Sequence, residues 1–409
     1  MRTKSNAVSN PYYTYGMLYK SENFKKWEKS KGEKFRKYRE AWTDRIKDLD
    51  PGDFPLNINT EITTRCNLAC SFCTHLSLDA EQIGDIPFAD FSRIINEGEK
   101  YGLPTVNING LGEPLLHKDI AEFIRHAKEH GVVDVMFHTN GTIMTPKLAE
   151  KLIDAGLDRI VFSVDSPDKK TYESMRILNS SYVESLKKQN VTPKGVCWEN
   201  TVNNVLNFLE VRNRRGLHSP IVRATMVATD KTIHQVPDLL KLWTPHVDHI
   251  TVQDLTWRTK LLEDGQWENK ETSALPANFD SIREEAIQRD IKFVCPSLYQ
   301  SIYQFYGGDV IPCGNPNART HLVMGRWDSQ TIHDVWLGKQ YRELRELHSA
   351  GKWHEHPICR DCDIALLELY KDMVLQNIKI DWNTSDLDNS LAIMGEQLEA
   401  IYLKEDGSR

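Results

Sequence analysis

The 409-residue chain lacks several features that define common classes of protein. No run approaches the roughly 18 apolar residues of a membrane-spanning helix, so we expect no membrane partner. The chain has no basic excess, with 51 Lys and Arg against 58 Asp and Glu, which argues against nucleic acid as a partner. Its first residues, 1–6, are followed by polar and aromatic residues rather than the apolar core of a signal peptide, so export is not expected.

Cysteine is also scarce, with eight residues, and three of them lie on one short segment. Without an export signal we expect a cytoplasmic protein, in which thiols ligate metals more often than they form disulfides. Cys66, Cys70 and Cys73 have the spacing C-x3-C-x2-C. Three thiolates on one loop can hold three irons of a 4Fe–4S cluster and leave the fourth free to bind a small molecule. Part of a zinc site is the alternative, although no second C-x2-C pair lies nearby.

The cysteine loop, with the aromatic Phe72 before its last cysteine, resembles the signature of the radical S-adenosylmethionine (SAM) superfamily. The resemblance implies that the open iron binds the amino and carboxylate groups of SAM. One electron, from an external donor such as flavodoxin or ferredoxin, then cleaves SAM reductively to methionine and a 5′-deoxyadenosyl radical. The radical takes a hydrogen atom from the substrate, while the protein orients the reactants and excludes water and oxygen.

Strand-like runs alternate with helical patterns between residues 55 and 255. Such alternation predicts an α/β fold of parallel strands with crossover helices, whose chemistry lies at the C-terminal ends of the strands. Six repeats are too few for a closed eightfold barrel, so we expect a partial (β/α)6 barrel. The expected strands are residues 56–62, 105–108, 132–137, 159–164, 221–227 and 249–252. The expected helices are residues 88–100, 120–127, 145–156, 202–212 and 233–243.

The remaining segments are expected to add smaller units to this barrel. They are an N-terminal helical extension (1–54), an insertion within the barrel (177–200), a charged connector (256–294), a small C-terminal domain (295–371) and a partly helical tail (372–409). Within the small domain we expect a hairpin of 301–306 and 309–312 around two glycines, followed by a helix over 332–347.

Polar and glycine residues directly follow the expected strands and are candidates for SAM contacts. The second strand ends in Gly110, Gly112, Glu113 and Pro114, where the glycines would let a ligand approach the backbone. This segment resembles the family's GGE-type motif, which holds the amino group of SAM, although Leu111 replaces the first of the paired glycines.

Four more candidates follow from the same resemblance. Asn140 lies in the turn after the third strand, which faces the cofactor in the family. Ser163 and Asp165 share one face of the fourth strand and suit the ribose hydroxyls, unless they cap a helix. Arg176 and Arg223 are candidates for the methionine carboxylate, with Arg223 favoured, although either could form a structural ion pair.

Four of the remaining cysteines form a second set with the spacing C-x17-C-x45-C-x2-C. Their thiolates can fully ligate a second, auxiliary 4Fe–4S cluster, and a zinc site is the alternative. The set is Cys295, Cys313, Cys359 and Cys362. It resembles the twitch domain, a short form of the SPASM domain, and the match includes Gly325 and the segments 332–336 and 341–345. A full SPASM domain needs about three more cysteines, which this chain lacks.

Four functions are compatible with these features. The layout with one auxiliary cluster resembles that of 2-deoxy-scyllo-inosamine dehydrogenases, which favours dehydrogenation of a small sugar, aminocyclitol or polyol with the auxiliary cluster as electron acceptor. The remaining Cys197 could instead return a hydrogen atom to a carbon radical, as in a redox-neutral epimerase. A peptide-modifying maturase ranks third, because residues 1–54 look too short and too helical for a leader-binding domain. The fourth is an iron–sulfur carrier without catalysis.

Overall fold

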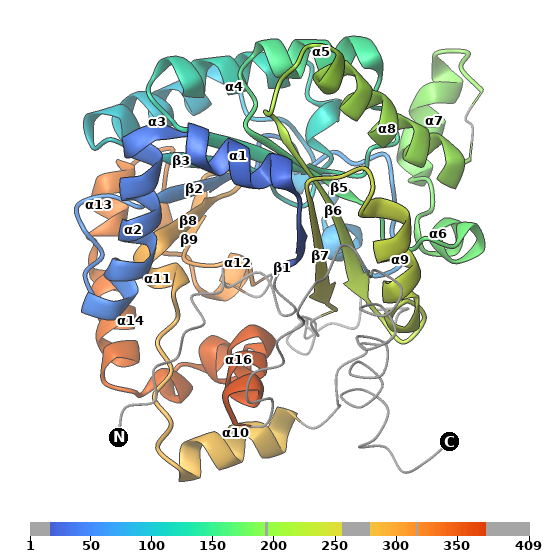
Figure 1. Cartoon of the computed structure of the whole chain (residues 1–409). Helices are drawn as coiled ribbons and strands as arrows, with labels where there is room; N and C mark the ends of the chain where they lie inside the picture. The colour runs from blue at the N-terminus through green and yellow to red at the C-terminus, as the bar shows by residue number, and fades with distance from the viewer. Residues whose placement is uncertain (1–16, 193–194, 256–278, 316–317, 374–409) are drawn as a thin grey trace.

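The computed structural model of the chain describes residues 17–192, 195–255, 279–315 and 318–373. The strands of these residues form one sheet, with the order β1-β7-β6-β5-β4-β3-β2-β8-β9-β10 (Figure 1). In chain order the strands are β1 (Met17–Lys20), β2 (Asn57–Thr60), β3 (Thr105–Ile108), β4 (Asp134–Thr139), β5 (Arg159–Ser163), β6 (Ile221–Ala228), β7 (His249–Asp254), β8 (Ser301–Gln304), β9 (Asp309–Ile311) and β10 (Gly325–Arg326). None of the helices in these ranges combines the length and apolar character needed to cross a bilayer.

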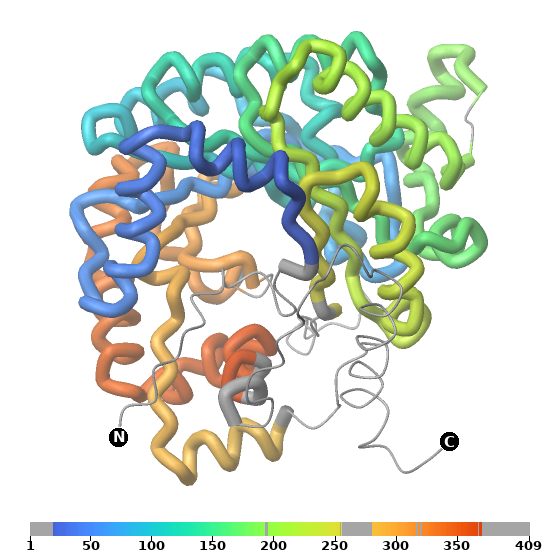
Figure 2. Tube along the Cα trace, viewed as in Figure 1, coloured from blue at the N-terminus to red at the C-terminus, as the bar shows by residue number. Residues whose placement is uncertain are grey.

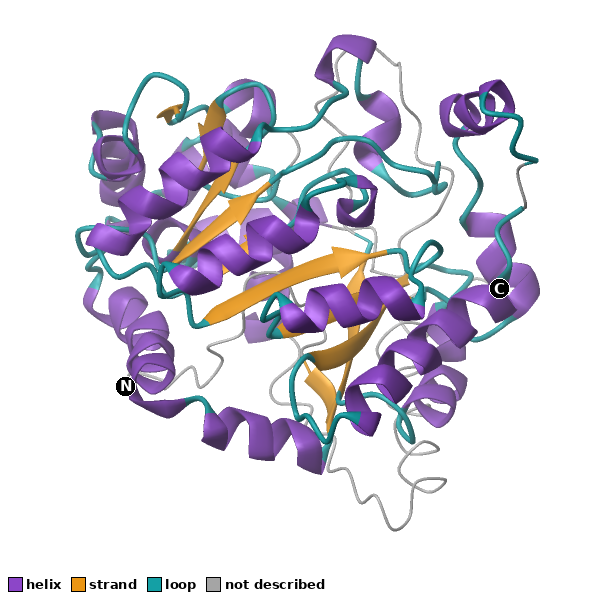
Figure 3. Cartoon of the chain, turned by 90° about the horizontal axis from the view of Figure 1, so that it is seen from above, coloured by secondary structure: helices purple, strands orange, loops and turns teal. Residues whose placement is uncertain are grey.

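The six strands expected from the sequence are β2 to β7, and each pairs in parallel with the next one along the chain. The partial barrel of parallel strands is therefore confirmed, with its helices outside the sheet (Figure 3). The helices between these strands are α3 (Phe88–Lys100), α4 (Ile120–Glu129), α5 (Pro146–Asp154), α6 (Lys169–Met175), α7 (Ser180–Lys188), α8 (Trp198–Arg214) and α9 (Val236–Trp243).

The two faces of the parallel sheet differ in chemistry because side chains alternate along each strand. One face is apolar and is buried against the helices; it includes Ile58, Val106, Phe137, Ile160, Val222 and Ile250. The opposite, inward face carries polar side chains that pair across neighbouring strands. Asn107 donates to Asn59 at 2.9 Å, and Thr251 donates to Thr225 at 3.0 Å. A polar inward face leaves hydrogen-bonding groups where a ligand could meet them.

Two N-terminal helices, α1 (Glu22–Ser30) and α2 (Gly32–Asp48), cover the amino ends of the strands. Their buried aromatic residues pack against Leu56 and Ile221, which lie at the starts of β2 and β6. Lys34 Nζ donates to the carbonyl of Gly131, just before β4, at 2.5 Å. The described part of the extension is helical as predicted, but it also contains β1, which pairs antiparallel with β7. The helices leave the carboxyl ends of the strands open for chemistry.

The predicted hairpin of β8 and β9 is present, but it does not stand apart from the barrel. β8 pairs in parallel with β2 and so continues the barrel sheet past its first strand. Thr60 Oγ1 donates to Gln304 Oε1 at 2.7 Å, and Asn59 Nδ2 donates to the carbonyl of Ile302 at 3.2 Å. The sequence pattern gave no sign of this pairing, because it joins residues that are more than 240 positions apart.

Helices complete the C-terminal region. They are α10 (Phe279–Gln288), α11 (Ser297–Gln300), α12 (Ala318–His321), α13 (Ile332–Trp336), α14 (Lys339–Ser349), α15 (Pro357–Arg360) and α16 (Asp363–Met373). The helix expected over residues 332–347 is two helices, α13 and α14, with Gly338 between them. A Cβ atom at Gly338 would lie 2.8 Å from the carbonyl oxygen of Asp334, so the chain turns where a side chain does not fit. Residues 256–278 of the connector and 374–409 of the tail lie outside the described residues.

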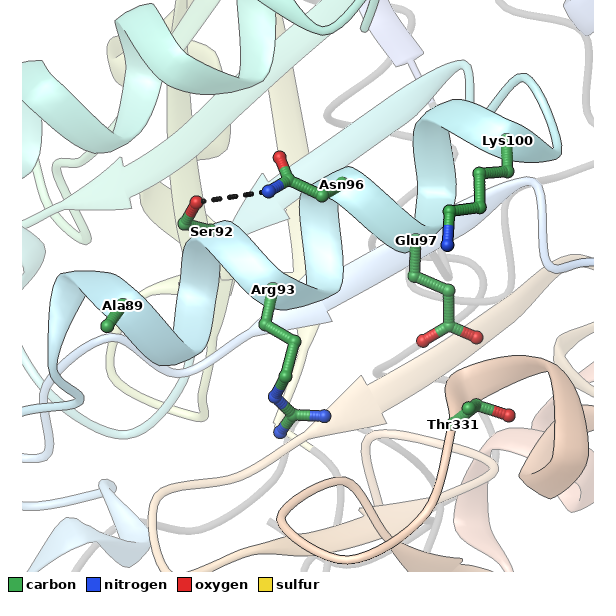
Figure 4. A pocket seen from close by; sticks show the side chains of 7 residues that line it. All are labelled: Ala89, Ser92, Arg93, Asn96, Glu97, Lys100 and Thr331. Carbon is green, nitrogen blue, oxygen red and sulfur yellow. Dashed lines mark hydrogen bonds between the residues drawn. The ribbon is translucent and has the colours of Figure 1, made fainter.

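The C-terminal region contacts both the N-terminal helices and the barrel (Figure 2). Trp336 Nε1 donates to the carbonyls of Pro51 and Gly52, each at 3.2 Å. On the barrel side, Glu97 of α3 accepts the backbone N–H groups of Ile332 and His333 at 3.0 and 2.8 Å. Figure 4 shows Glu97 and Arg93 pointing from α3 toward the segment that carries Thr331. These contacts fix the C-terminal cysteines relative to the barrel.

Candidate active site

The first cysteine loop follows the carboxyl end of β2, as the sequence predicted. Backbone hydrogen bonds attach it to the last residue of α6 and to the chain directly after this helix. Ala69 N–H donates to the carbonyl of Ile177 at 2.7 Å, and Ser71 N–H donates to that of Met175 at 2.9 Å. Phe72 is half-buried within this loop. The loop therefore has a fixed conformation that is supported from outside the cysteine motif.

The surroundings of the three thiols fit ligation by metal. Burial raises the pKa of Cys66 and of Cys73, and it raises the pKa of Cys70 to about 12. The neighbouring thiols raise the pKa of Cys66 further, so the three groups interact electrostatically. Without metal, each proton therefore stays on its sulfur at neutral pH. Bound iron would replace these protons, as coordinated thiols are deprotonated.

The positions of the sulfur atoms bear on the zinc alternative. Zn–S bonds of about 2.3 Å place tetrahedral thiolates only about 3.8 Å apart. Among the described residues, the one group of at least three potential ligand atoms within 4.8 Å of one another is Glu173, Cys197 and Glu199. Neither predicted cysteine set forms such a close group.

The turn after β3 is held by the buried carboxylate of Glu113. Its Oε1 accepts the Thr139 hydroxyl at 2.7 Å, and its Oε2 accepts the backbone N–H of Asn140 at 2.7 Å. Asn140 Nδ2 in turn donates to Asn67 Oδ1 in the cysteine loop at 2.8 Å. Pro114 begins the short 3-10 helix Pro114–Leu116 and is buried. This network joins the cysteine loop, the turn after β3 and the turn after β4. Within it, Glu113 stabilises the turn after β3.

The two glycines of this turn are explained by protein contacts. A Cβ atom at Gly110 would lie 2.4 Å from Cγ of Glu61. A Cβ atom at Gly112 would lie 2.2 Å from the carbonyl oxygen of Thr63. The chain itself therefore borders the Cβ position of each glycine, and contact of a ligand with the backbone of Gly110 and Gly112 stays a prediction.

Asp165 and Arg176 form a buried ion pair, which is the alternative that the sequence left open for Arg176. Arg176 Nε donates to Asp165 Oδ2 at 2.7 Å, and Nη2 donates to the same oxygen. The other carboxylate oxygen, Oδ1, accepts the backbone N–H of Val227 at 2.9 Å. The two residues were expected to contact different parts of SAM, but here each is the main partner of the other. Ser163 lies on the same inward face and is half-buried.

Arg223 is the third residue of β6, pairs with His249 at the start of β7, and is buried. Its Nη2 lies 3.2 Å from Nε2 of His138 on β4. Because a guanidinium only donates, His138 accepts through Nε2 and carries its proton on Nδ1. Burial, and next the charge of Arg223, lower the pKa of His138 well below its usual value. The inward face therefore offers a cation and a neutral imidazole side by side.

The four C-terminal cysteines gather around the β8–β9 hairpin. Cys295 precedes α11 and β8, and Cys313 follows β9, so both lie toward the amino end of β8. Cys359 lies in α15, and Cys362 precedes α16. Burial raises the pKa of Cys295 to about 12, with a further increase from Cys362. Burial also raises the pKa of Cys359 well above its usual value, and the charges of the other three cysteines add to this.

Cys197 lies apart from both sets. It precedes α8, and its thiol donates to Glu199 Oε2 at 3.1 Å. Glu199 also pairs with the exposed Lys169 of α6 at 2.8 Å. These partners belong to the outer helical layer rather than to the inward face of the sheet. The surroundings therefore do not favour Cys197 as a hydrogen donor to a substrate bound on the inward face.

Sequence reasoning missed Glu61 and Arg319, which pair across the site. Glu61 follows β2, and its Oε2 lies 3.1 Å from Nη2 of Arg319. A charged residue at the end of an otherwise uncharged strand was the available signal for Glu61. Nothing in the sequence could pair it with an arginine 258 residues away.

A pH dependence of stability follows from two buried histidines, His138 and His249, whose pKa values lie well below the usual range, chiefly through burial. In the unfolded chain a histidine has a pKa of about 6.5. Below this pH the unfolded state therefore binds a proton at each histidine, and the folded state does not. Each histidine should therefore lower the free energy of unfolding by about 1.4 kcal/mol between pH 7.5 and pH 5.5.

Chemical denaturation of wild type and His249→Gln at the two pH values tests this dependence. The loss of unfolding free energy on acidification should be smaller in the variant by about 1.4 kcal/mol. An equal loss in both proteins would mean that His249 is not held neutral in the folded state.

Comparisons with known families agree with this geometry. A model described as the radical SAM superfamily matches residues 60–242, and one described as an iron-sulfur cluster-binding domain, SPASM, matches residues 295–363. The site thus defines an iron–sulfur protein that uses SAM. The chain belongs to the radical SAM superfamily and carries a SPASM-type domain. Its cofactors are a 4Fe–4S cluster, SAM and an additional iron–sulfur cluster in the C-terminal domain.

Curated relatives match the chain to different extents. A tungsten-containing aldehyde ferredoxin oxidoreductase cofactor-modifying protein of Pyrococcus furiosus is 24% identical over 329 residues, which are 74% of this chain and 86% of the relative. A probable GTP 3′,8-cyclase of Methanococcus maripaludis is 39% identical over 128 residues. That match covers 31% of this chain and 41% of the cyclase, so it concerns only part of each protein.

Solved structures share the fold at low sequence identity. SuiB of Streptococcus suis bound to S-adenosylmethionine superimposes with a TM-score of 0.55 at 16% identity, over 80% of this chain and 76% of SuiB. Native anSMEcpe with bound AdoMet superimposes with a TM-score of 0.53 at 13% identity, over 83% of this chain and 100% of that protein. At these identities the likeness concerns the fold alone.

Proposed function

We propose that the protein dehydrogenates a small hydroxylated metabolite, such as a sugar, aminocyclitol or polyol. In this proposal Cys66, Cys70 and Cys73 ligate the SAM cluster. The auxiliary 4Fe–4S cluster is ligated by Cys295, Cys313, Cys359 and Cys362. When bound, these cofactors supply a 5′-deoxyadenosyl radical that removes a hydrogen atom from the substrate, and a second cluster that can accept an electron. Loss of one hydrogen atom, one proton and one electron converts an alcohol into a carbonyl.

The observation that carries the proposal is the position of the two cysteine sets relative to the sheet. The first set follows the carboxyl end of β2, whereas Cys295 and Cys313 lie toward the amino end of β8. Because β8 pairs in parallel with β2, these are opposite ends of the same part of the sheet. A substrate on the inward face would then lie between the source of the radical and an electron acceptor. A redox-neutral reaction has no need of that acceptor.

The inward face supports a hydroxylated substrate. Its hydrogen-bonding groups are mostly uncharged amides and hydroxyls, among them Asn59, Asn107, Thr225 and Thr251. Such groups both donate to and accept from hydroxyls. The neutral His138 can add a donor through Nδ1, because its Nε2 already accepts from Arg223.

The residues that the sequence suggests for SAM binding stay proposals. Their positions and hydrogen bonds in the structure divide these residues into two groups. Ser163 and Arg223 present side chains on the inward face, and Phe72 lies in the cysteine loop, so these are the proposed direct contacts. Another group is proposed to shape the site through the protein contacts described above. It consists of Gly110, Gly112, Glu113, Pro114, Asn140, Asp165 and Arg176.

The test is an anaerobic reaction of the reconstituted, reduced protein with a panel of sugars, aminocyclitols and polyols carrying deuterium on carbon. We expect one substrate to give 5′-deoxyadenosine and oxidised product in a ratio of about one to one, with deuterium transferred to 5′-deoxyadenosine. The same reaction is also run in heavy water with unlabelled substrate. A product that keeps its oxidation state and gains deuterium at carbon would instead establish an epimerase. Cleavage of SAM that no member of the panel stimulates would contradict the proposed substrate class.

A second candidate is modification of a cofactor precursor. It is favoured by the alignment with the cofactor-modifying protein of Pyrococcus furiosus, which extends over 86% of that relative and 74% of this chain. A maturase acting on a peptide is less favoured, because the described part of residues 1–54 contains one strand, β1, and that strand joins the barrel sheet instead of forming a separate one.

A further inference from the structure

Glu61 is a buried carboxylate at the point where the barrel, the turn after β3 and the C-terminal region meet. Its side chain is 0% exposed. Oε1 accepts the backbone N–H of Leu111 at 2.9 Å, within the turn that contains Gly110 and Gly112. Oε2 accepts the backbone N–H of Tyr306, in the β8–β9 hairpin, at 3.2 Å. One side chain therefore contacts segments far apart in the sequence.

Arg319 supplies the opposite charge. Its Nη2 lies 3.1 Å from Oε2 of Glu61, and its Nη1 lies 3.4 Å from Oε1, so the pair is bidentate. The guanidinium also lies over the ring of Phe305, 4.4 Å from the centroid. Arg319 belongs to α12, which packs next to β9 (Figure 1).

Each partner of the pair lies close in sequence to one of the two cysteine sets. Glu61 precedes Cys66 by five residues, and Arg319 follows Cys313 by six. The contact from Glu61 to Leu111 adds the turn after β3, where the family motif places SAM. The ion pair is thus a short connection from the auxiliary cysteines to the SAM site.

The ionised form of Glu61 depends on Arg319. Burial raises the pKa of Glu61, and the charge of Arg319 is the largest of the opposing influences, followed by the two backbone N–H groups. A buried carboxylate that loses its counter-charge must stay charged at high cost or take up a proton. A protonated carboxyl is a weaker acceptor for the Leu111 N–H than a carboxylate, and a carboxylate without its counter-charge is free to turn away from the turn toward solvent.

Gly110 makes the turn sensitive to the position of Glu61. A Cβ atom at Gly110 would lie 2.4 Å from Cγ of Glu61, so the backbone of the turn is in close contact with this side chain. A shift of the Glu61 side chain toward Gly110 would therefore displace the backbone of the turn.

We propose that Glu61 and Arg319 are positioning residues that couple the auxiliary-cluster segment to the SAM-binding turn. Arg319 holds Glu61 in place, and Glu61 holds the turn through Leu111 and Gly110. Movement of the segment after Cys313 then changes the affinity for SAM. The inference rests on the proposal that the Gly110–Pro114 turn shapes the SAM site, and it is independent of the proposed dehydrogenation.

The experiment measures SAM affinity of the full chain after anaerobic reconstitution, without substrate. Binding is followed by equilibrium dialysis with labelled SAM, and iron is counted in each sample. We expect Arg319→Met to weaken SAM binding about tenfold or more while both clusters keep their iron. Arg319→Lys, which keeps the charge, should restore part of the affinity.

A double-mutant cycle isolates the coupling from loss of structure. Glu61→Gln keeps an acceptor for Leu111 N–H but removes the charge that Arg319 neutralises. The variant with both Glu61→Gln and Arg319→Met should therefore bind SAM more tightly than Arg319→Met alone, because no unpaired charge is buried. Arg326→Met is the matched control, since the ion pairs of Arg326 with Asp309 and Asp328 are at the surface, and its SAM affinity should not change.

Three outcomes would overturn the proposal. They are unchanged SAM affinity in Arg319→Met, additive effects of the two substitutions, and weaker SAM binding that follows loss of iron from the first cluster. Because no substrate is present, these outcomes leave the proposed dehydrogenation untouched. Failure to find an oxidised product would likewise leave the coupling untouched.

Discussion

Replacing Cys70 with alanine is expected to lower the rate of 5′-deoxyadenosine formation by at least about a thousandfold, or about 4 kcal/mol in activation free energy. The reason is that two thiolates cannot hold the cluster in the geometry that leaves one iron open to SAM. Cys70 is the most buried of the three cysteines, at 8% exposure, so no external ligand can readily take its place. The measurement is chromatographic detection of 5′-deoxyadenosine after anaerobic reconstitution and reduction.

Cys197→Ser is the matched control for this variant, because it also removes one thiol. Cys197 bonds to Glu199 in the outer helical layer, away from both cysteine sets, and its loss should change neither the iron content nor SAM cleavage. If Cys70→Ala cleaved SAM at the rate of Cys197→Ser, the loop of residues 66–73 would not hold the catalytic cluster.

Replacing Cys359 with alanine is expected to separate SAM cleavage from product formation. The auxiliary cluster should be lost, while the first cluster, which is bound by a different part of the chain, should remain. SAM would still be cleaved, but the oxidised product should fall about a hundredfold or more, because no acceptor takes the electron of the substrate radical. The ratio of product to 5′-deoxyadenosine, together with iron per chain, gives the result.

If Cys359→Ala kept the wild-type ratio of product to 5′-deoxyadenosine, the C-terminal cysteines would not have a redox function. Their function would then be structural. Trp353→Phe serves as a control for general damage to this region. Trp353 is buried in the cluster of α10 and α16 but belongs to neither cysteine set, so its variant should lose stability and keep the ratio.

The strand–helix core could be predicted from the sequence because its signals are local. The strand expected at residues 105–108 is β3 to the residue, and the helix expected at 88–100 is α3. Each such element carries its own periodicity and its own ends, for example Thr145 capping α5 before Pro146. Parallel order then follows, since a crossover helix returns each strand to the same direction.

The parts that could not be predicted depend on pairs of distant residues. Nothing near β1 or β8 indicates that these strands extend the barrel sheet on its two sides. Similarly, the type and spacing of Asp165 and Arg176 suit a ligand as well as they suit each other, and only the fold brings them together.

The glycines of the turn after β3 show the same limit at a smaller scale. Their sequence motif predicts close approach of a ligand to the backbone, and the structure places atoms of Glu61 and Thr63 next to the Cβ positions of these glycines. A single sequence shows that a side chain does not fit at Gly110 and cannot tell which neighbour excludes it.

The first cluster is expected to have an open iron that binds SAM. The direct measurement is the electron paramagnetic resonance spectrum of the anaerobically reconstituted, reduced protein, recorded with and without SAM. The account predicts about eight irons per chain, four for each cluster, and a spectrum of one cluster that changes when SAM is added. In Cys359→Ala about four irons and the SAM-sensitive spectrum should remain. A reduced cluster whose spectrum is identical with and without saturating SAM would contradict the account.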